Sequence, residues 1–373
     1  MQIVPQNKHL DNTVIVCNIF SKYSHTTKNK GVIVIETLHR GKQSFLFDQH
    51  PAILATSAIG GKKEREGPLA AYFDHTESDT KFKQKTWEKA ESKMQFLALE
   101  AAKKKLNIRD CDIDLLLAGD LLNQCISSSY SVRNTGVPFL GLYGACSTMA
   151  EGLCLAAMTV NGGYARLAGA LSSSHFASAE RQYRFPLGYG GQRTPTAQWT
   201  VTGAACALIG KQETGPFLHA ATIGTVMDYG IKDANNMGAA MAPAAYHTLR
   251  AHFDDLGLAP SDYDLIVTGD LGVVGKEILM DLFRKDGVSL GGIYNDCGTM
   301  IYDLQKQDVH AGGSGCGCGS VVLCGYLLNQ MKKGKYRSIL FCGTGALHSP
   351  TSLQQNESIP GVCHAVSITM KRM

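Results

Sequence analysis

GLYGACSTMAEG, residues 141–152, is the stretch that decides the fold of this 373-residue chain. It overlaps an apolar segment at residues 137–142 and joins a predicted strand to a predicted helix through a turn of small residues. Cys146 lies in that turn, where free N–H groups and the positive end of the helix dipole attract anions and lower the pKa of a thiol. The stretch is therefore either a nucleophile turn or an anion-binding cradle.

A strand pattern found just before this stretch returns later in the chain. DIDLLLAGDLLNQ recurs as DYDLIVTGDLGVV, and in both copies an acidic pair leads into an apolar strand that ends in Gly-Asp-Leu. A predicted helix precedes each copy, and a second pair of similar strands follows. Matches in the same order indicate an internal duplication into two βαβ-type halves, each with a parallel sheet covered by helices. The repeated strands are residues 112–124 and 262–274, the helices are 83–106 and 242–256, and the second strands begin at Gly163 and Gly334.

The duplication divides the chain into three segments. Residues 41–215 form the first predicted half and residues 216–373 the second. Residues 1–40 carry two β-like runs without turn residues that would pair them, so we predict an N-terminal extension or sequence upstream of the true start. The first half opens with a predicted edge strand in residues 42–69.

The second half has a Gly-rich helix start of its own. AGGSGCGCGS, residues 311–320, leads into a predicted helix at residues 321–331. We expect the duplication to bring this helix start and the one at Cys146 to a single shared cleft. Such a cleft has a positive bias that comes from backbone N–H groups rather than from charged side chains.

The composition is that of a globular protein, with 44% hydrophobic and 18% charged residues. The net charge of +4 is small and the basic residues are scattered, which argues against a nucleic-acid partner. We identify no secretory signal, and several of the twelve Cys lie in apolar runs, so we expect reduced thiols in a cytoplasmic-type compartment. No uninterrupted apolar run reaches the roughly 18 residues of a membrane span.

Cys316 and Cys318 lie close in sequence to His310 and Cys324, a combination that suggests a metal site. Structural zinc sites, however, place two to four residues between paired cysteines, and a one-residue gap at a helix start directs the thiols apart. The same glycine-rich run lacks the Lys-Ser/Thr of a phosphate-binding loop. We therefore expect neither a metal nor another cofactor.

A duplicated α/β chain with Cys146 at a helix start resembles the thiolase and ketoacyl-synthase superfamily. Within it, a set of specific motifs resembles the stage V sporulation protein AD (SpoVAD) family from about Gly41 to the C-terminus. The resemblance implies an α/β, thiolase-like fold in which the two duplicated halves form a layered α/β/α/β/α core. The motifs are GACSTM, SSSHFASAERQYRFPLGYGGQ, DANNMGAAMAPAA, YNDCGTMIYD, AGGSGCGCGS and GALHSPTSLQQNESIPGVCH.

The family resemblance also implies a function in sporulation and germination. It implies binding of dipicolinic acid (pyridine-2,6-dicarboxylate) or its calcium chelate, within the spore channel complex that takes up dipicolinate in sporulation and releases it in germination. The implied partners are the SpoVA membrane proteins, and the implied location is the forespore or spore, as a cytoplasmic protein attached peripherally to the spore inner membrane. The superfamily further implies a homodimer paired through an exposed edge strand, for which the small-residue strand at residues 166–172 is the candidate.

The bases that a condensing enzyme of the superfamily uses are incomplete in this chain. Such an enzyme typically carries a His on the turn after the second-half strand, where this chain has Thr-Gly-Asp-Leu at residues 268–271. His310 precedes a glycine loop that lacks the thiolase Pro and is one residue short, whereas Cys342 falls where thiolases carry their second Cys. We therefore predict a non-catalytic binding pocket. The alternatives are an acyl-transfer or condensing enzyme, with Cys146 as nucleophile and His310 or Cys342 as base, and a pure scaffold.

A pocket for dipicolinate needs hydrogen-bond donors, a hydroxyl or two, a cation and apolar walls for the ring. The two helix starts supply donors, and Arg181 and Arg184 are the candidate cations, although an ion pair with Glu180 would also explain either residue. His175 is more typical of a structural histidine, and Asn295 also fits ordinary turn chemistry. The predicted ligand-binding residues are Cys146, Ser147, His175, Arg181, Arg184, Asn295, Gly313, Ser314, Gly343 and Thr344.

Overall fold

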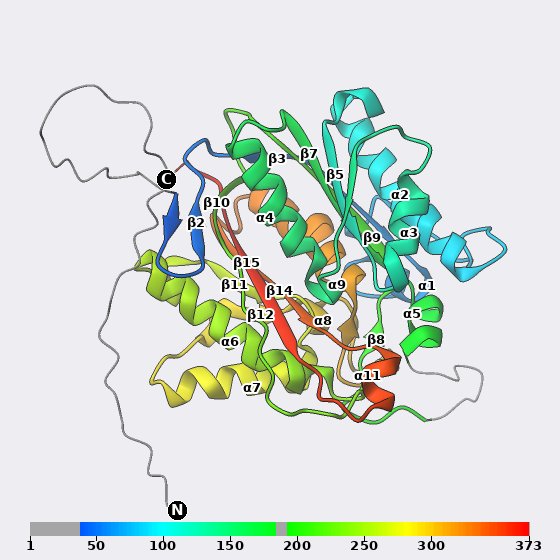
Figure 1. The fold of residues 1–373 in the computed structure, drawn as a ribbon, viewed down its shortest axis with the longest axis vertical. Helices are drawn as coiled ribbons and strands as arrows, with labels where there is room; N and C mark the ends of the chain where they lie inside the picture. Colours follow the sequence, from blue (N-terminus) through cyan, green and yellow to red (C-terminus); the bar gives the residue numbers. More distant parts are fainter. Residues whose placement is uncertain (1–37, 184–191, 373) are drawn as a thin grey trace, which may run out of the picture. The chain divides into compact units, whose positions relative to one another are not determined.

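The computed structural model of the chain describes residues 38–183 and 192–372 (Figure 1). The extension predicted for residues 1–40 lies outside these residues except at its end, where His39–Arg40 form a short strand, β1. No helix among the described residues is long and apolar enough to cross a membrane.

The central sheet has 13 strands, of which ten form two five-stranded sets and three short ones pair beside them. The first comprises β3 (Ala52–Gly60), β5 (Leu115–Gly119), β6 (Phe139–Gly141), β7 (Leu167–Ser174) and β9 (Gly203–Gly210). The second comprises β10 (Phe217–Thr222), β11 (Leu265–Thr268), β12 (Tyr294–Asp296), β14 (Ser338–Ala346) and β15 (Gly361–Thr369). The strands lie in the orders β3-β9-β7-β5-β6 and β10-β15-β14-β11-β12. Counted along the chain within each set, both orders are first, fifth, fourth, second, third. In each set the first two contacts are antiparallel and the last two are parallel, so the predicted duplication is confirmed.

Two of the strand predictions are wrong. Each set is mixed rather than fully parallel, because β9 and β15 run antiparallel to both of their neighbours. The segment predicted as an edge strand, residues 42–69, contains β3, which lies inside the sheet between β9 and β10. Its sequence AILATSAIG consists of apolar and small residues and is buried almost throughout, as is typical of an internal strand.

Helices form three layers around the two sets, which gives the α/β/α/β/α order implied by the superfamily (Figure 1). The helices of these layers are α2 (Trp87–Leu106), α3 (Ile126–Val132), α4 (Thr148–Asn161), α6 (Met237–Leu256) and α7 (Gly272–Lys285), and α9 (Cys316–Val321) continues through a π-helical segment (Val322–Leu327) into α10 (Leu328–Lys332). α2 and α3 cover the first set, α6 and α7 cover the second, and α4 and α9 lie between the sets. The other elements are β2 (Ser44–Leu46), β4 (His75–Thr76), α1 (Lys62–Arg65), α5 (Phe176–Tyr183), β8 (Trp199–Thr200), α8 (Cys297–Met300), β13 (Gly313–Ser314) and α11 (Pro350–Gln354).

Capping residues set the helix starts that periodicity alone misplaced. α2 begins at Trp87 instead of residue 83, because the Thr86 hydroxyl accepts a hydrogen bond from the Lys89 N–H at 3.3 Å. α6 begins at Met237 instead of residue 242, because the Asn236 side chain accepts from the Ala239 N–H. Both are N-cap residues of the preferred types.

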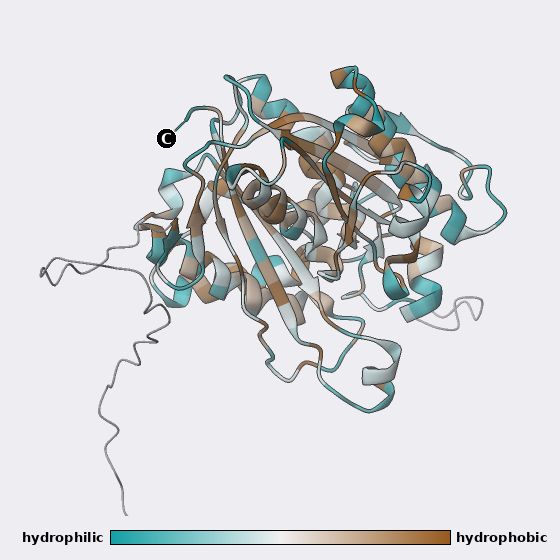
Figure 2. Cartoon of the chain, turned by 45° about the horizontal axis from the view of Figure 1, so that its top comes forward, coloured by the Kyte–Doolittle hydropathy of each residue, from teal (hydrophilic) through white to brown (hydrophobic). Residues whose placement is uncertain are grey.

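The innermost hydrophobic core joins the two halves. It brings Leu153 of α4 together with Val267 of β11, Phe341 of β14 and Val366 of β15. Figure 2 shows hydrophobic residues concentrated along the strands and hydrophilic residues on the outer loops and helix surfaces. Burial of apolar surface on both faces of α4 therefore fixes how the two sets pack.

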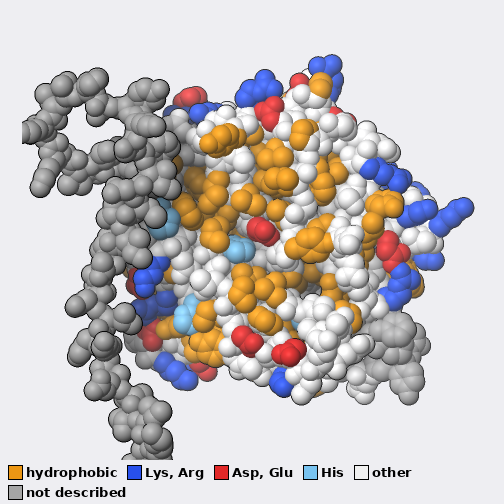
Figure 3. All heavy atoms as spheres, viewed as in Figure 1, with side chains coloured by type: hydrophobic (Ala, Val, Ile, Leu, Met, Phe, Trp, Pro, Cys, Tyr) orange, Lys and Arg blue, Asp and Glu red, His pale blue; other side chains and the backbone are white. Residues whose placement is uncertain are grey.

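The strand predicted to pair two copies of the chain is internal. Residues 166–172 fall on β7, which lies between β5 and β9 and is buried along its whole length, so this edge-strand prediction is wrong. The strand at that end of the sheet is β6, where Leu140 and Tyr143 are 55% and 59% exposed. On the face seen in Figure 3, hydrophobic side chains gather centrally while Lys and Arg lie mainly at the margin.

A close approach between β14 and the start of α4 holds the Cys146 turn in place. A methyl group added at Gly343 would meet the Ala150 Cβ at 2.6 Å and the Ser147 carbonyl oxygen at 3.0 Å. At Gly345 it would meet the Gly144 carbonyl oxygen at 2.6 Å. The glycines of the Cys-Gly-Thr-Gly segment therefore allow the second half to lie directly against the turn of the first.

Replacing Gly343 by Ala is expected to lower the free energy of unfolding by about 1–3 kcal/mol, because the added methyl overpacks a closed contact. Gly292→Ala is the matched control, since a methyl there has no heavy atom within 4 Å, and its effect should stay below about 1 kcal/mol. Urea unfolding of both variants measures the difference. An equally small effect of both would mean that β14 does not press on α4.

Candidate functional site

Cys146 lies in a short 3₁₀ turn, Ala145–Ser147, that precedes α4. Ala145 has a φ of +48°, in the left-handed region that residues with a side chain seldom adopt. Three side chains hold this turn. The Cys316 thiol and the Thr148 hydroxyl donate to the Ala145 carbonyl at 2.8 and 2.6 Å, and the Ser147 hydroxyl donates to the Gly144 carbonyl at 2.6 Å. Backbone strain that surrounding contacts hold in this way is typical of functional turns.

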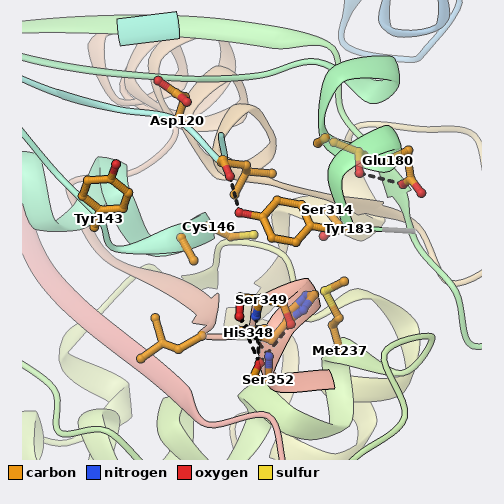
Figure 4. A pocket seen from close by; sticks show the side chains of 16 residues that line it. Asp120, Tyr143, Cys146, Glu180, Tyr183, Met237, Ser314, His348, Ser349 and Ser352 are labelled. Carbon is orange, nitrogen blue, oxygen red and sulfur yellow. Dashed lines mark hydrogen bonds between the residues drawn. The ribbon is translucent and has the colours of Figure 1, made fainter. Parts of the chain in front are cut away.

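A cavity of about 400 Å³ opens at this turn (Figure 4). Cys146 of the first half and Ser314 of the second both line it, so the two helix starts meet at one cleft, as the duplication predicted. The Tyr183 ring points into the cavity, and its hydroxyl donates to the Leu121 carbonyl. The lining residues are Asp120, Leu121, Tyr143, Ala145, Cys146, Ala179, Glu180, Tyr183, Thr200, Met237, Ser314, Ala346, Leu347, His348, Ser349 and Ser352.

The side chain next to the Cys146 thiol is a buried carboxyl group rather than a histidine. Asp270, from the turn after β11, is fully buried and is the acceptor toward which the thiol is directed. It also accepts from the Thr344 hydroxyl at 2.7 Å, the Gly315 N–H at 2.9 Å and the Ser314 hydroxyl at 3.2 Å. Burial first, and then the charge of Asp270, raise the pKa of Cys146 well above its ordinary value. The low thiol pKa expected from the helix start is therefore wrong, because burial and a tertiary contact outweigh the helix dipole.

Asp120 occupies the same place in the first Gly-Asp-Leu copy and lines the cavity directly. Its carboxylate accepts from the Leu122 N–H at 2.9 Å and from the Ser128 N–H and hydroxyl at 2.8 and 2.7 Å. Behind it, Glu91 of α2 accepts from the hydroxyls of Ser173 and Ser178 at 3.1 and 2.7 Å. Burial and the neighbouring charge of Asp120 raise the pKa of Glu91. Asp120 therefore forms part of the cavity wall, and Glu91 lies behind it.

The described lining of the cavity contains no Lys or Arg. Arg181, one predicted cation, forms an ion pair with Glu88 of α2 and lies 5.4 Å over the Trp87 ring, so it does not line the cavity. Arg184, the other, lies outside the described residues. Asp120 and Glu180 instead contribute carboxyl groups, which makes the described surface of the cavity acidic.

The remaining predicted site residues lie behind or away from this cavity. His175 bonds the Thr80 carbonyl at 2.7 Å and accepts from the Ala177 N–H, which are structural contacts, and burial lowers its pKa. Asn295 bonds Lys276 at 2.8 Å, and Gly313 belongs to β13, which pairs with β8. Three predicted residues contact the site without lining it. Ser147 donates a hydrogen bond to the Gly144 carbonyl, Thr344 donates one to Asp270, and Gly343 lies directly against Ala150.

The two candidate bases of the enzymatic alternative do not line the cavity. His310 bonds the Thr194 carbonyl at 2.8 Å and lies 2.9 Å from Asp308. Cys342 is fully buried beside Cys363, and burial raises its pKa well above the ordinary value. Neither position therefore supplies a base that could deprotonate the Cys146 thiol.

Sequence reasoning missed the carboxyl groups and the ring that shape the cavity. Asp120 and Asp270 were visible as parts of the repeated Gly-Asp-Leu motif, which marked the site as well as the duplication. Tyr183 and His348, whose rings meet edge to face at 5.3 Å, come from α5 and from the loop before α11. Their meeting depends on the packing of the two halves, which no local pattern indicates.

Comparisons with known proteins agree with this architecture. The family model for stage V sporulation protein AD (SpoVAD) matches residues 41–369. Stage V sporulation protein AD of Bacillus subtilis (strain 168) is 44% identical over 326 residues, which is 87% of this chain and 96% of that protein. Among solved structures, an OleA variant of Xanthomonas campestris matches with a TM-score of 0.56 at 14% identity, over 87% of this chain and 99% of that one. The 3-oxoacyl-[acyl-carrier-protein] synthase III of Aquifex aeolicus matches with a TM-score of 0.51 at 13% identity, over 86% and 99%. These structural likenesses establish the thiolase-like fold.

Alkylation by iodoacetamide at pH 8 is expected to modify Cys146 more slowly than the exposed Cys111, because the raised pKa leaves little thiolate. Asp270→Asn removes the adjacent negative charge and should accelerate alkylation of Cys146 by about tenfold for each pKa unit recovered. Asp281→Asn, on the exposed face of α7, should leave the rate unchanged. Peptide mass spectrometry measures both sites together. Faster alkylation of Cys146 than of Cys111 in the unaltered chain would contradict the assignment.

The raised pKa of Glu91 predicts how stability changes with pH. Its folded pKa lies above its unfolded value, so the folded state binds more protons and stability falls as the pH rises above about 4.5. The slope contributed by this group is at most about 1.4 kcal/mol per pH unit. Glu91→Gln should flatten the fall, since an amide does not ionise and can accept from one serine hydroxyl and donate to the other. Urea unfolding from pH 5 to 8.5 measures it, and an unchanged slope in the variant would show that Glu91 ionises normally.

Proposed function

The chain belongs to the stage V sporulation protein AD family, and on that premise we propose that it is a non-catalytic binding protein for dipicolinic acid or its calcium chelate in sporulation and germination. The observation that carries the proposal is the contact between the Cys146 thiol and the Asp270 carboxyl. Acyl transfer requires a thiolate nucleophile and an adjacent base, and this contact favours the neutral thiol. His348, the imidazole in the described lining, packs edge-on against Tyr183.

The size and walls of the cavity suit a ligand with a single ring. A volume of about 400 Å³ lies at the lower end of the range for small-molecule sites. Tyr183 offers an aromatic face, and Leu121, Met237 and Leu347 offer apolar contacts. Thr200, Ser314, Ser349 and Ser352 bring hydroxyl groups to the same cavity.

The charge of the cavity favours the calcium chelate over the free acid. At neutral pH, dipicolinate is a dianion, and a dianion beside Asp120 and Glu180 would be repelled. The one-to-one calcium chelate has no net charge, and its cation prefers oxygen ligands such as carboxylates. We therefore propose that calcium accompanies the ligand into this cavity.

Family membership also supports a place for the chain in the spore channel complex. We propose that it works with the SpoVA membrane proteins while attached peripherally to the spore inner membrane. We further propose a homodimer, with β6 as the strand at the interface, since this strand ends the sheet and has exposed Leu140 and Tyr143 beside it.

Calorimetric titration of the full chain tests the ligand. Dipicolinate with calcium is expected to bind more tightly than dipicolinate with a chelator present. Ser314→Ala should weaken binding about fivefold to tenfold by removing one hydroxyl contact, and Cys146→Ala should weaken it less. His310→Ala, which alters a residue outside the cavity, is the control.

Two outcomes would contradict the proposal. One is the absence of saturable binding, with or without calcium, at concentrations well above micromolar. The other is an acyl adduct on Cys146 after incubation with an acyl-CoA, lost in Cys146→Ala, because that result would assign the cavity to acyl transfer instead.

A further inference from the structure

A second cavity of about 490 Å³ lies at the opposite end of α5 from the first. α5 contributes Phe176 and Ala177 from its start to this cavity, whereas Ala179, Glu180 and Tyr183 line the first. The two cavities share no lining residue. The second is lined by Lys62, Lys63, Glu64, Glu66, Thr80, Trp87, His175, Phe176, Ala177, Trp199 and Thr202.

Aromatic rings form much of the wall of this second cavity. Both tryptophans of the chain, Trp87 and Trp199, line it together with Phe176. The rings of Phe176 and Trp199 are stacked, with centroids 3.9 Å apart and planes 12° apart. All three side chains are only partly buried, so a flat ligand can extend the aromatic cluster. Contacts of this kind contribute beyond the area they bury.

Positive charges surround these rings. The Lys63 ammonium lies 4.1 Å from the centroid of Trp199, and Lys62 lines the cavity beside it. Lys81 and Arg181 lie over the Trp87 ring at 5.5 and 5.4 Å. The cation–π contact of Lys63 holds its ammonium at the wall of the cavity, where it can also reach an anionic group on a ligand. Lys81 and Arg181 are not among the lining residues.

A buried carboxyl group in the same wall has an oxygen without a partner. Glu64 is 1% exposed, and one of its oxygens accepts from the Thr202 N–H at 3.0 Å and from the Tyr302 hydroxyl. Its other oxygen, Oε2, has no hydrogen-bond partner among the described residues. Burial raises the pKa of Glu64 to about 7, so a large fraction of the group is protonated near neutral pH and can donate a hydrogen bond. A buried polar atom without a hydrogen-bond partner destabilises the fold unless a ligand or a water molecule supplies that hydrogen bond.

We propose that this second cavity binds a planar aromatic anion, with its ring against Trp87, Phe176 and Trp199 and its anionic group held by Lys62, Lys63 and the carboxyl of Glu64. Two sources share this chemistry: an aromatic carboxylate of the pyridine-carboxylate type and a nucleoside monophosphate. The site is separate from the first cavity and does not depend on what the first cavity binds.

Intrinsic fluorescence tests the proposal directly, because both tryptophans line this cavity and neither lines the first. The full chain, excited at the red edge of tryptophan absorption, is titrated with pyridine-2-carboxylate in one arm and adenosine monophosphate in the other. A saturable change is expected in one arm, and the arm in which it occurs identifies the source of the ligand. A linear, non-saturating change in both arms, or no change up to about ten millimolar, overturns the proposal.

Matched variants separate this cavity from other sites. Lys63→Met should weaken the saturable change about tenfold by removing a charge-assisted contact, while Lys285→Met, on the last turn of α7, should leave it unchanged. Ser314→Ala in the first cavity should also leave the fluorescence titration unchanged, while it alters the calorimetric titration with calcium dipicolinate. An unchanged affinity in Lys63→Met, with the fold intact by circular dichroism, would place the binding elsewhere and overturn the proposal.

Discussion

The Asp270 carboxyl joins the two halves of this protein at the point where function is expected. It lies at the end of β11 and accepts hydrogen bonds from Thr344 of β14 and from Gly315 at the start of α9. The Cys146 thiol, from the other half, is directed at the same group. A buried carboxyl group is stable only when its hydrogen bonds are satisfied, so these contacts depend on one another. Separation of the halves would remove the thiol contact and leave the hydrogen bonds that Asp270 accepts from its own half.

Much of the fold could be predicted from the sequence, because the duplication left two copies of the same motifs in the same order. Two Gly-Asp-Leu motifs and two glycine-rich helix starts indicated the repeat, and the strand orders confirm it. The wrong predictions concern neighbours in the sheet. β3 and β7 were each assigned to an edge, yet both are internal. Small and apolar residues indicate burial, but the identity of a strand's neighbour depends on long-range pairing that a local pattern does not contain.

The candidate site was predictable in position but not in chemistry. Cys146 and Ser314 do line one cavity, as the two helix starts suggested. The predicted low thiol pKa was wrong because the reasoning considered only the local helix, whereas burial and Asp270 act through the tertiary structure. Gly343 and Thr344 were taken for ligand contacts, yet one allows close packing on Ala150 and the other donates to Asp270. Short-range patterns locate such residues without saying which way their side chains face.

The duplication also explains why two equivalent carboxyl groups lie near the cavity. The same motif position gave Asp120 in one half and Asp270 in the other, but their surroundings differ. Each carboxyl group accepts its hydrogen bonds within its own half: Asp120 from Leu122 and Ser128, and Asp270 from Ser314, Gly315 and Thr344. Asp120 lines the cavity, whereas Asp270 lies next to the Cys146 thiol. Substituting Asp120 would therefore change the wall that a ligand meets, and substituting Asp270 would change the environment of the thiol. The proposed preference for the calcium chelate rests on the same arrangement, because the described lining supplies carboxyl groups and contains no Lys or Arg.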